Sequence, residues 1–137
     1  MGSGDGTWPL HPSCHHVLEF EVNAINIFRG EEDAKVYQPG DPVFQSGECG
    51  EHMYVVLKGR IDIKIGDQIV ETVQPGGIFG ELALIDDEER SADAVAQTEV
   101  ELALVDKKRF TYLVQNHPFF ALYVLKLLAE RLRRYSK

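Results

Sequence analysis

The alternation of apolar and polar residues predicts a series of short β-strands that begins near residue 34. Residues 53–57 form a continuous apolar run, and in 61–65 isoleucines alternate with polar residues. Alternation of this kind is typical of a strand with one buried and one solvated face. Further strands are expected at 68–73 and, from a second alternating run, at 99–104.

Turn residues separate these segments. Pro39-Gly40 and Pro75-Gly76 each place proline before glycine, the order that suits the two central positions of a type II turn. Several short strands at roughly ten-residue spacing favour an antiparallel jelly-roll β-barrel over about 34–106. The predicted fold class is therefore mainly β with flanking helices.

The end of the chain has helical periodicity. Asp106 suits the N-cap of a first helix, in which Phe110, Leu113 and Val114 fall on one face. Pro118 is well placed as the first residue of a second helix. Together the two helices are expected to cover about 107–134.

The second helix is apolar nearly all round in its first half and carries arginines in its last turn, where they suit the helix dipole. A helix that is apolar on several faces needs cover on two sides. We therefore expect it to pack on the barrel and on a second partner, either another copy of the chain or a different protein.

Residues 1–16 are rich in glycine, proline and histidine without any period, and are interpreted as a flexible tail that precedes a domain over 17–137. The apolar residues of 17–30 are expected to pack on the core. No metal is expected in the tail, because its ligand-type residues match no closed zinc spacing. Those residues are His11, Cys14, His15 and His16.

Composition narrows the class of protein. A chain of 137 residues with 44% hydrophobic residues fits one domain, and no apolar run is long enough for a membrane-spanning helix. With 22 acidic against 14 basic side chains, the net charge of −8 makes binding to nucleic acid polymers unfavourable. Two cysteines make no disulfide framework, which favours the cytoplasm.

The charge is distributed unevenly. From Lys107 onward there are eight basic residues and one acid, so residues 1–106 hold six basic and 21 acidic side chains, a formal charge of −15. An anion bound within 1–106 must therefore be held by local geometry and not by the general field.

One segment, 76–92, has features of an anion site. Gly80 precedes a short stretch that can form a helical turn, whose first N–H groups would be free to bind an anion. Arg90 is the only basic residue between Lys64 and Lys107. Alternatively, Arg90 forms surface ion pairs with the acids at 86–89, and Glu81 is an ordinary solvated turn acid.

The sequence FGELALIDDEERSA, residues 79–92, resembles the phosphate-binding cassette of the cyclic nucleotide-binding domain family. The likeness extends to YQPGDPVFQSGECGEHMYVVLKGRIDI at 37–63, which resembles the first strands of that family. Residues 107–134 resemble its closing B and C helices. Sensor domains of bacterial cAMP receptor proteins and of protein kinase A regulatory subunits are of this kind.

The resemblance implies a jelly-roll barrel that binds a 3′,5′-cyclic nucleotide. Glu81 would accept a hydrogen bond from the ribose 2′-hydroxyl, and Arg90 would pair with the cyclic phosphate. The other expected ligand-binding residues are Gly80, Leu82, Ala83 and Ser91 around the phosphate, Val70, Val73 and Ile78 at the sugar and base, and Phe79.

The identity of the base is less defined. A hydroxyl at Ser91 can serve the phosphate of either nucleotide, and we favour cAMP while leaving cGMP open. Asp93 departs from the family pattern, so its acid is expected to face solvent or to perturb the rim of the pocket. By resemblance, Tyr135 and Ser136 lie near the place where an adenine is contacted.

These features predict a non-enzymatic sensor that needs no cofactor and responds to its ligand by moving the last helix. The chain has no room for a helix-turn-helix domain, so it is either a stand-alone sensor or the regulatory domain of a longer protein. Two alternatives remain: a ligand-free dimerisation module, and a cupin-like metalloenzyme. The second is disfavoured because, of five histidines, only His52 is near a predicted strand.

Overall fold

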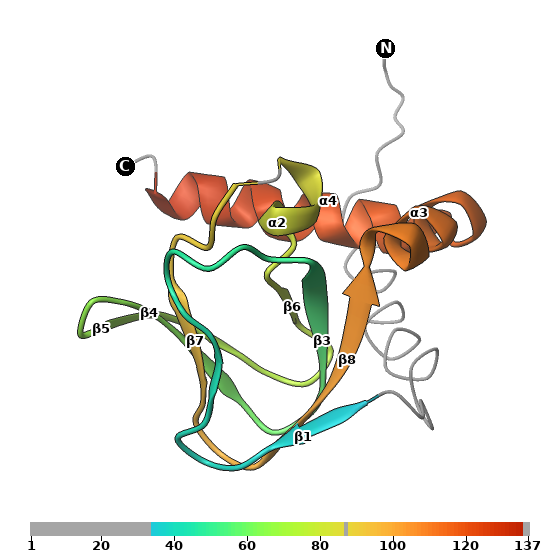
Figure 1. Ribbon diagram of the computed structural model, residues 1–137. Helices are drawn as coiled ribbons and strands as arrows, with labels where there is room; N and C mark the ends of the chain where they lie inside the picture. Colours follow the sequence, from blue (N-terminus) through green and yellow to red (C-terminus); the bar gives the residue numbers. More distant parts are fainter. Residues whose placement is uncertain (1–33, 87, 136–137) are drawn as a thin grey trace, which may run out of the picture.

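The computed structural model describes residues 34–86 and 88–135, and these form two antiparallel sheets with three helices at one end (Figure 1). The expectations for 1–33 and for Ser136 lie outside the described residues. The strands are β1 (Lys35–Tyr37), β2 (Pro42–Phe44), β3 (His52–Lys58), β4 (Ile61–Ile65), β5 (Gln68–Val73), β6 (Ile78–Phe79), β7 (Asp93–Ala96) and β8 (Val100–Asp106). The helices are α2 (Leu82–Ile85), α3 (Lys107–Asn116) and α4 (Pro118–Tyr135).

Each sheet has four strands, in the orders β1-β8-β3-β6 and β2-β7-β4-β5. All pairs are antiparallel, and consecutive strands repeatedly fall in different sheets. The two sheets face each other around a shared interior, and α2, α3 and α4 lie along one end of them (Figure 1). The predicted jelly-roll barrel with C-terminal helices is therefore confirmed.

Strand β3 separates two apolar cores. Met53, Val55 and Leu57 pack with Phe120, Tyr123 and other residues under the helices. Its alternate residues, Tyr54 and Val56, point into the other core, between the sheets. Burial on both faces explains why the sequence of β3 is continuously apolar instead of alternating.

Both predicted proline-glycine turns are present. The Asp41 N–H donates to the Gln38 carbonyl over 3.0 Å, and the Gly77 N–H donates to the Gln74 carbonyl over 2.8 Å. Gly40 and Gly76 each have φ of 90°, the left-handed conformation that the third position of a type II turn requires.

The helices begin where the sequence predicts. The Asp106 side chain accepts from the Arg109 N–H over 2.8 Å, which caps α3, and α4 begins at Pro118. Leu113 is buried, whereas Val114 is exposed, so only part of the predicted apolar face of α3 meets the core.

Helix α4 packs on the barrel through Phe120, Tyr123 and Val124, which are all buried. The Tyr123 hydroxyl also donates to the Gly76 carbonyl over 2.8 Å, joining α4 to the turn before β6. None of the described helices combines the length and apolarity needed to cross a membrane.

A β-bulge interrupts the pairing of β4 with β5. Ile63 pairs with Glu71 and the next residue, Lys64, pairs with Ile69, so Val70 is the extra residue. Strict alternation would send Val70 and Glu71 to opposite faces. With the bulge, both side chains line the same cavity.

Candidate functional site

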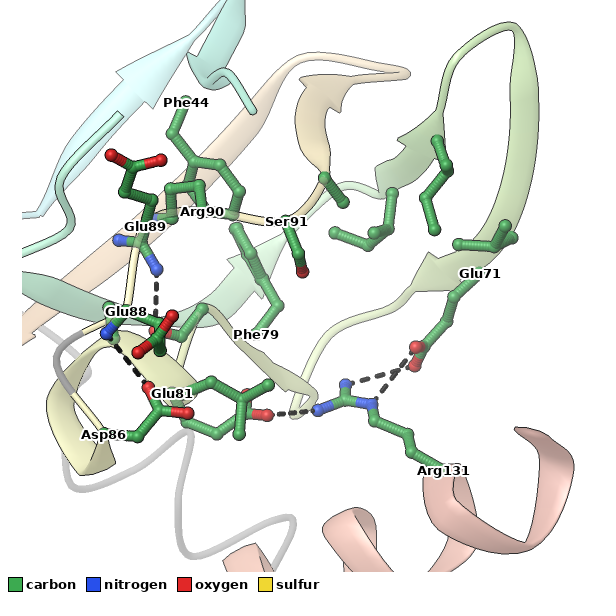
Figure 2. Close-up of a pocket in the computed structure, with 17 residues that line it drawn as sticks. Phe44, Glu71, Phe79, Glu81, Asp86, Glu88, Glu89, Arg90, Ser91 and Arg131 are labelled. Atoms are coloured by element: carbon green, nitrogen blue, oxygen red, sulfur yellow. Dashed lines mark hydrogen bonds and ion pairs between the residues drawn. The ribbon is translucent and has the colours of Figure 1, made fainter. Parts of the chain in front are cut away.

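A cavity of about 560 Å³ lies between the 79–92 segment, the β4–β5 hairpin and the C-terminal half of α4 (Figure 2). Of the ten ligand-binding residues predicted from the sequence, eight line it. They are Val70, Phe79, Gly80, Glu81, Leu82, Ala83, Arg90 and Ser91.

The other two predicted residues, Val73 and Ile78, do not line the cavity. The Val73 side chain is buried between the sheets, and that of Ile78 is buried beneath the helices. The Ile78 backbone carbonyl nevertheless takes part in the site, because it accepts a hydrogen bond from Arg131 over 2.8 Å.

Arg90 lies just before β7 and is only 8% exposed. Its Nη1 donates to the Gly80 carbonyl over 2.8 Å and its Nη2 donates to the His52 carbonyl over 2.7 Å. It forms no ion pair with Asp86, Glu88 or Glu89, so the surface ion pair considered for these acids is absent. Two neutral carbonyls thus hold a guanidinium that forms no direct ion pair with a described carboxylate.

Aromatic rings form the wall behind this guanidinium. The Arg90 Cζ lies 4.1 Å from the centre of the Phe44 ring and 5.8 Å from that of Tyr54. Its Nε is buried and donates to no acceptor among the described residues. Burial lowers the pKa of Arg90, an effect that the neighbouring Tyr54 and Glu81 oppose. The site therefore presents a largely desolvated cation with unused donor capacity.

Two glycines leave room for Arg90. Gly80 has φ of 77°, and a Cβ there would lie 3.0 Å from Arg90 Nη1. At Gly50 a Cβ would overlap the Arg90 guanidinium carbon. The Arg90 backbone is fixed separately, since its N–H donates to the Glu48 carbonyl over 2.8 Å.

Glu81 precedes the single turn of α2 and is 4% exposed. Its Oε2 accepts from Arg131 Nη1 over 2.9 Å, whereas its Oε1 is buried and accepts from no donor among the described residues. The alternative interpretation of Glu81 as a solvated turn acid is therefore wrong. Glu81 has one oxygen held and one open to a further donor.

Arg131 brings α4 into the site. Its Nε and Nη2 donate to the two carboxylate oxygens of Glu71, each over 3.1 Å (Figure 2). Arg131 also makes the bonds with Glu81 and Ile78 described above. Burial opposes the charge of Arg131 most strongly, yet Glu81 and Glu71 together outweigh it and raise its pKa. Arg131 is therefore a firmly charged bridge between the helix and the barrel.

Sequence reasoning did not assign Arg131, Glu71, Phe44 or Gly50 to the site. Arg131 had a signal, since it continues the spacing of four and three residues that starts with Phe120, Val124 and Leu127 on the core-facing side of α4. A charged residue on such a face needs a buried partner. Glu71 had no comparable signal, because the bulge that turns it inward is not visible in the sequence.

The remaining predictions near the site have distinct outcomes. Ser91 lines the cavity. Asp93 does not line the cavity. Its carboxylate accepts from the Ser46 N–H over 2.7 Å and so holds the loop that contains Ser46. Tyr135 ends α4, but its side chain and Ser136 lie outside what the structure describes. Within residues 34–86 and 88–135, no group of His, Cys, Asp or Glu side chains is arranged to hold a metal ion.

Comparisons with known proteins identify the family. The family model described as "Cyclic nucleotide-binding domain" matches residues 34–117. The "Cyclic AMP receptor protein" of Thermus thermophilus is 35% identical over 128 residues, covering 89% of this chain and 57% of that protein. A "cAMP-dependent protein kinase regulatory subunit" of Schizosaccharomyces pombe is 39% identical over 82 residues, covering 59% of this chain and 20% of that protein.

A solved structure reported under "A cyclic-GMP-dependent signalling pathway regulates bacterial phytopathogenesis" has a TM-score of 0.70 and 28% identity, and covers 86% of this chain and 95% of that one. The chain spans little more than half the length of its bacterial relative. The cassette, the barrel and the match over 34–117 agree, and the chain belongs to the cyclic nucleotide-binding domain family.

Proposed function

We propose that this chain binds a 3′,5′-cyclic nucleotide in the described cavity and acts as a regulatory domain without catalysing a reaction. The observation that carries the proposal is Arg90, a buried guanidinium that lines the cavity and lacks a carboxylate partner among the described residues. A buried unpaired charge is costly, and a bound monoanion would offset that cost. A cyclic phosphate is such a monoanion.

The phosphate would lie against Arg90 and the start of α2. The Nε of Arg90 has no acceptor, and each hydrogen bond to a charged group is worth about 1.5–3 kcal/mol. Leu82 and Ala83 open α2, and the first N–H groups of a helix have no intrahelical acceptor. The Ser91 hydroxyl on the cavity wall supplies one more donor.

The ribose would lie against Glu81. An ionised carboxylate is an acceptor only, and its buried Oε1 is open to a donor. The 2′-hydroxyl of a nucleotide is such a donor.

The base would occupy the far side of the cavity, where Ile63, Ile65 and Val70 form an apolar wall. This wall supports the binding of a purine face without separating adenine from guanine. We favour cAMP, because the curated relatives reported above are named for cAMP. The solved structure associated with cyclic GMP makes cGMP the alternative to test.

The output would pass through α4, which contributes Arg131 to the cavity. On its outer side Leu122, Leu125, Ala129 and Leu132 are exposed at spacings of three, four and three residues. This is the a/d spacing of a coiled coil, and it supports pairing with a second copy of the chain.

Isothermal titration calorimetry with cAMP and cGMP tests the proposal. For a ligand of about 22 heavy atoms at roughly −0.3 kcal/mol each, we expect binding near −7 kcal/mol, which is micromolar affinity. Arg90→Gln should weaken binding at least tenfold, while Arg60→Gln, an exposed arginine outside the cavity, should leave it unchanged.

No heat with either nucleotide at millimolar concentration would contradict the proposal. Self-association that persisted in such a non-binding protein would instead support the ligand-free dimerisation module.

A further inference from the structure

Glu71, Arg131 and Glu81 form a continuous charged cluster that joins strand β5, helix α4 and the segment before α2. We infer that Glu71 is a positioning residue for the ribose site, that it acts through Arg131, and that the cluster couples α4 to the 2′-hydroxyl of the ligand. The inference rests on the proposed function, since it concerns the same cavity.

The first step is the geometry of the Arg131 guanidinium. Glu71 engages Nε and Nη2 side by side, each over 3.1 Å, and such a forked pair fixes the plane of the guanidinium as well as its position. Nη2 also donates to the Ile78 carbonyl. With these contacts made, Nη1 is the nitrogen directed at Glu81, over 2.9 Å.

The second step is the orientation of Glu81. Arg131 binds Oε2 and leaves Oε1 as the buried oxygen without a partner. A carboxylate that is free to rotate would present either oxygen, or neither, to a ligand hydroxyl. Because Arg131 fixes the carboxylate by one oxygen, the other is held ready as a directed acceptor, and the order of action runs from Glu71 to Arg131 to Glu81.

The third step is the link to α4. The Glu81 side chain comes from the cavity wall and Arg131 from the last third of the helix, so their bond exists only while that part of α4 is docked. A hydroxyl that binds Glu81 more tightly in this arrangement must, by linkage, also favour the docked helix. The ribose contact and the position of α4 are thus coupled through a single guanidinium.

The charge of the cluster determines which measurement is informative. Removing the Glu71 carboxylate makes the cavity less negative, and that change raises the affinity for any anionic nucleotide. The absolute affinity therefore mixes two effects. The ratio of affinities for cAMP and 2′-deoxy-cAMP cancels the general effect, since the two ligands carry the same charge and differ only in the hydroxyl.

The experiment measures this ratio by calorimetry for the unmodified protein, Glu71→Gln, Arg131→Gln and Glu130→Gln. Glu130 is a matched control, an exposed acid of α4 that forms an ion pair with Lys126. We expect the unmodified protein and Glu130→Gln to prefer cAMP about tenfold or more, the effect of one hydrogen bond to a charged group. In Glu71→Gln and Arg131→Gln that preference should fall at least threefold. The cGMP and 2′-deoxy-cGMP pair is measured in parallel.

Amide hydrogen exchange gives a second readout that does not depend on affinity. Saturating cAMP should slow exchange in the C-terminal half of α4 in the unmodified protein, and this slowing should shrink in Glu71→Gln. If all four proteins keep the same preference and the same slowing, the inference is overturned while the proposed function stands. If the unmodified protein binds neither nucleotide, both are overturned.

Discussion

The guanidinium of Arg90 lies over the ring of Phe44, with its carbon 4.1 Å from the ring centre. The ring face carries partial negative charge, so it stabilises the cation without using any N–H donor. A carboxylate in the same place would neutralise the arginine and compete with an incoming anion. Phe44 therefore makes burial of the charge tolerable and leaves its donors open.

Replacing Phe44 by leucine should weaken nucleotide binding about twofold to thirtyfold, because a cation–π contact at a partly desolvated site is worth about 0.5–2 kcal/mol. Titration with cAMP measures the effect. The control is Phe110→Leu, whose ring packs edge-on against Phe120 away from the cavity. Phe110→Leu should lower the melting temperature but not the affinity, and equal affinity in both variants would contradict this role of Phe44.

Gly50→Ala should weaken nucleotide binding by displacing Arg90, since an added Cβ overlaps the guanidinium carbon and also crowds Ala83. We expect a loss of tenfold or more, measured by calorimetry. In an Arg90→Ala background the same change should cost clearly less, because only the contact with Ala83 remains. An equal loss in both backgrounds would mean that Gly50 acts independently of Arg90.

Asp106→Ala should destabilise the fold by about 1 kcal/mol, because the side chain caps the first turn of α3. For a domain of this size the melting temperature should fall by about 3–5 °C. Glu51→Ala, at an exposed loop position, should have little effect on the melting temperature. Ligand affinity should be unchanged, and an Asp106 variant as stable as the unmodified protein would show that the cap contributes nothing.

Leu125→Glu should reduce self-association. Leu125 is 61% exposed on the outer side of α4, within the apolar series at 122, 125, 129 and 132. If two helices pair through this series, a charge at 125 would be buried between them. Sedimentation equilibrium of the unmodified protein should give a dimer and that of the variant a monomer. Lys126→Glu, one residue further and outside the series, serves as the comparison. A monomeric unmodified protein would contradict the pairing.

Stability above pH 10 should depend on Tyr54. Burial raises the pKa of its hydroxyl above the ordinary value of 10.0, although Arg90 partly opposes this. As pH rises, Tyr54 therefore ionises in the unfolded chain before it ionises in the folded one. Its contribution to the free energy of unfolding is complete below the ordinary pKa and is lost as pH rises through the higher pKa of the folded state. Urea unfolding at pH 8 and pH 10.5 should show a smaller alkaline loss for Tyr54→Phe than for the unmodified protein, and equal losses would contradict the prediction.

Much of the fold could be predicted because its signals are local. Proline-glycine turns, the alternation in β4 and the cap at Asp106 each depend on a few neighbouring residues. The cassette was recognisable for the same reason, since Gly80, Glu81 and Arg90 lie within one short segment.

The rest of the site depends on contacts between distant segments. Arg131 is 50 residues from Glu81, and the carbonyl of His52 is 38 residues from Arg90. Every residue has a backbone carbonyl, so the residue type cannot show which carbonyl will accept a hydrogen bond. The bulge at Val70 changes the face of the sheet on which Glu71 lies, and no proline or glycine marks it in the sequence. The resemblance implies ligand contacts for Ile78 and Val73, yet an apolar side chain serves equally well in the core, where both are buried.

The two-sided packing of β3 has a consequence for how the domain can vary. The strand lies between the core that contains Tyr54 and the core that contains Phe120, so its odd and even residues belong to different cores. Substitutions at Met53 or Val55 would alter the packing of the helices on the barrel, whereas those at Tyr54 or Val56 would alter the core between the two sheets. The packing between the sheets and the packing under the helices can therefore be changed separately within a single seven-residue strand.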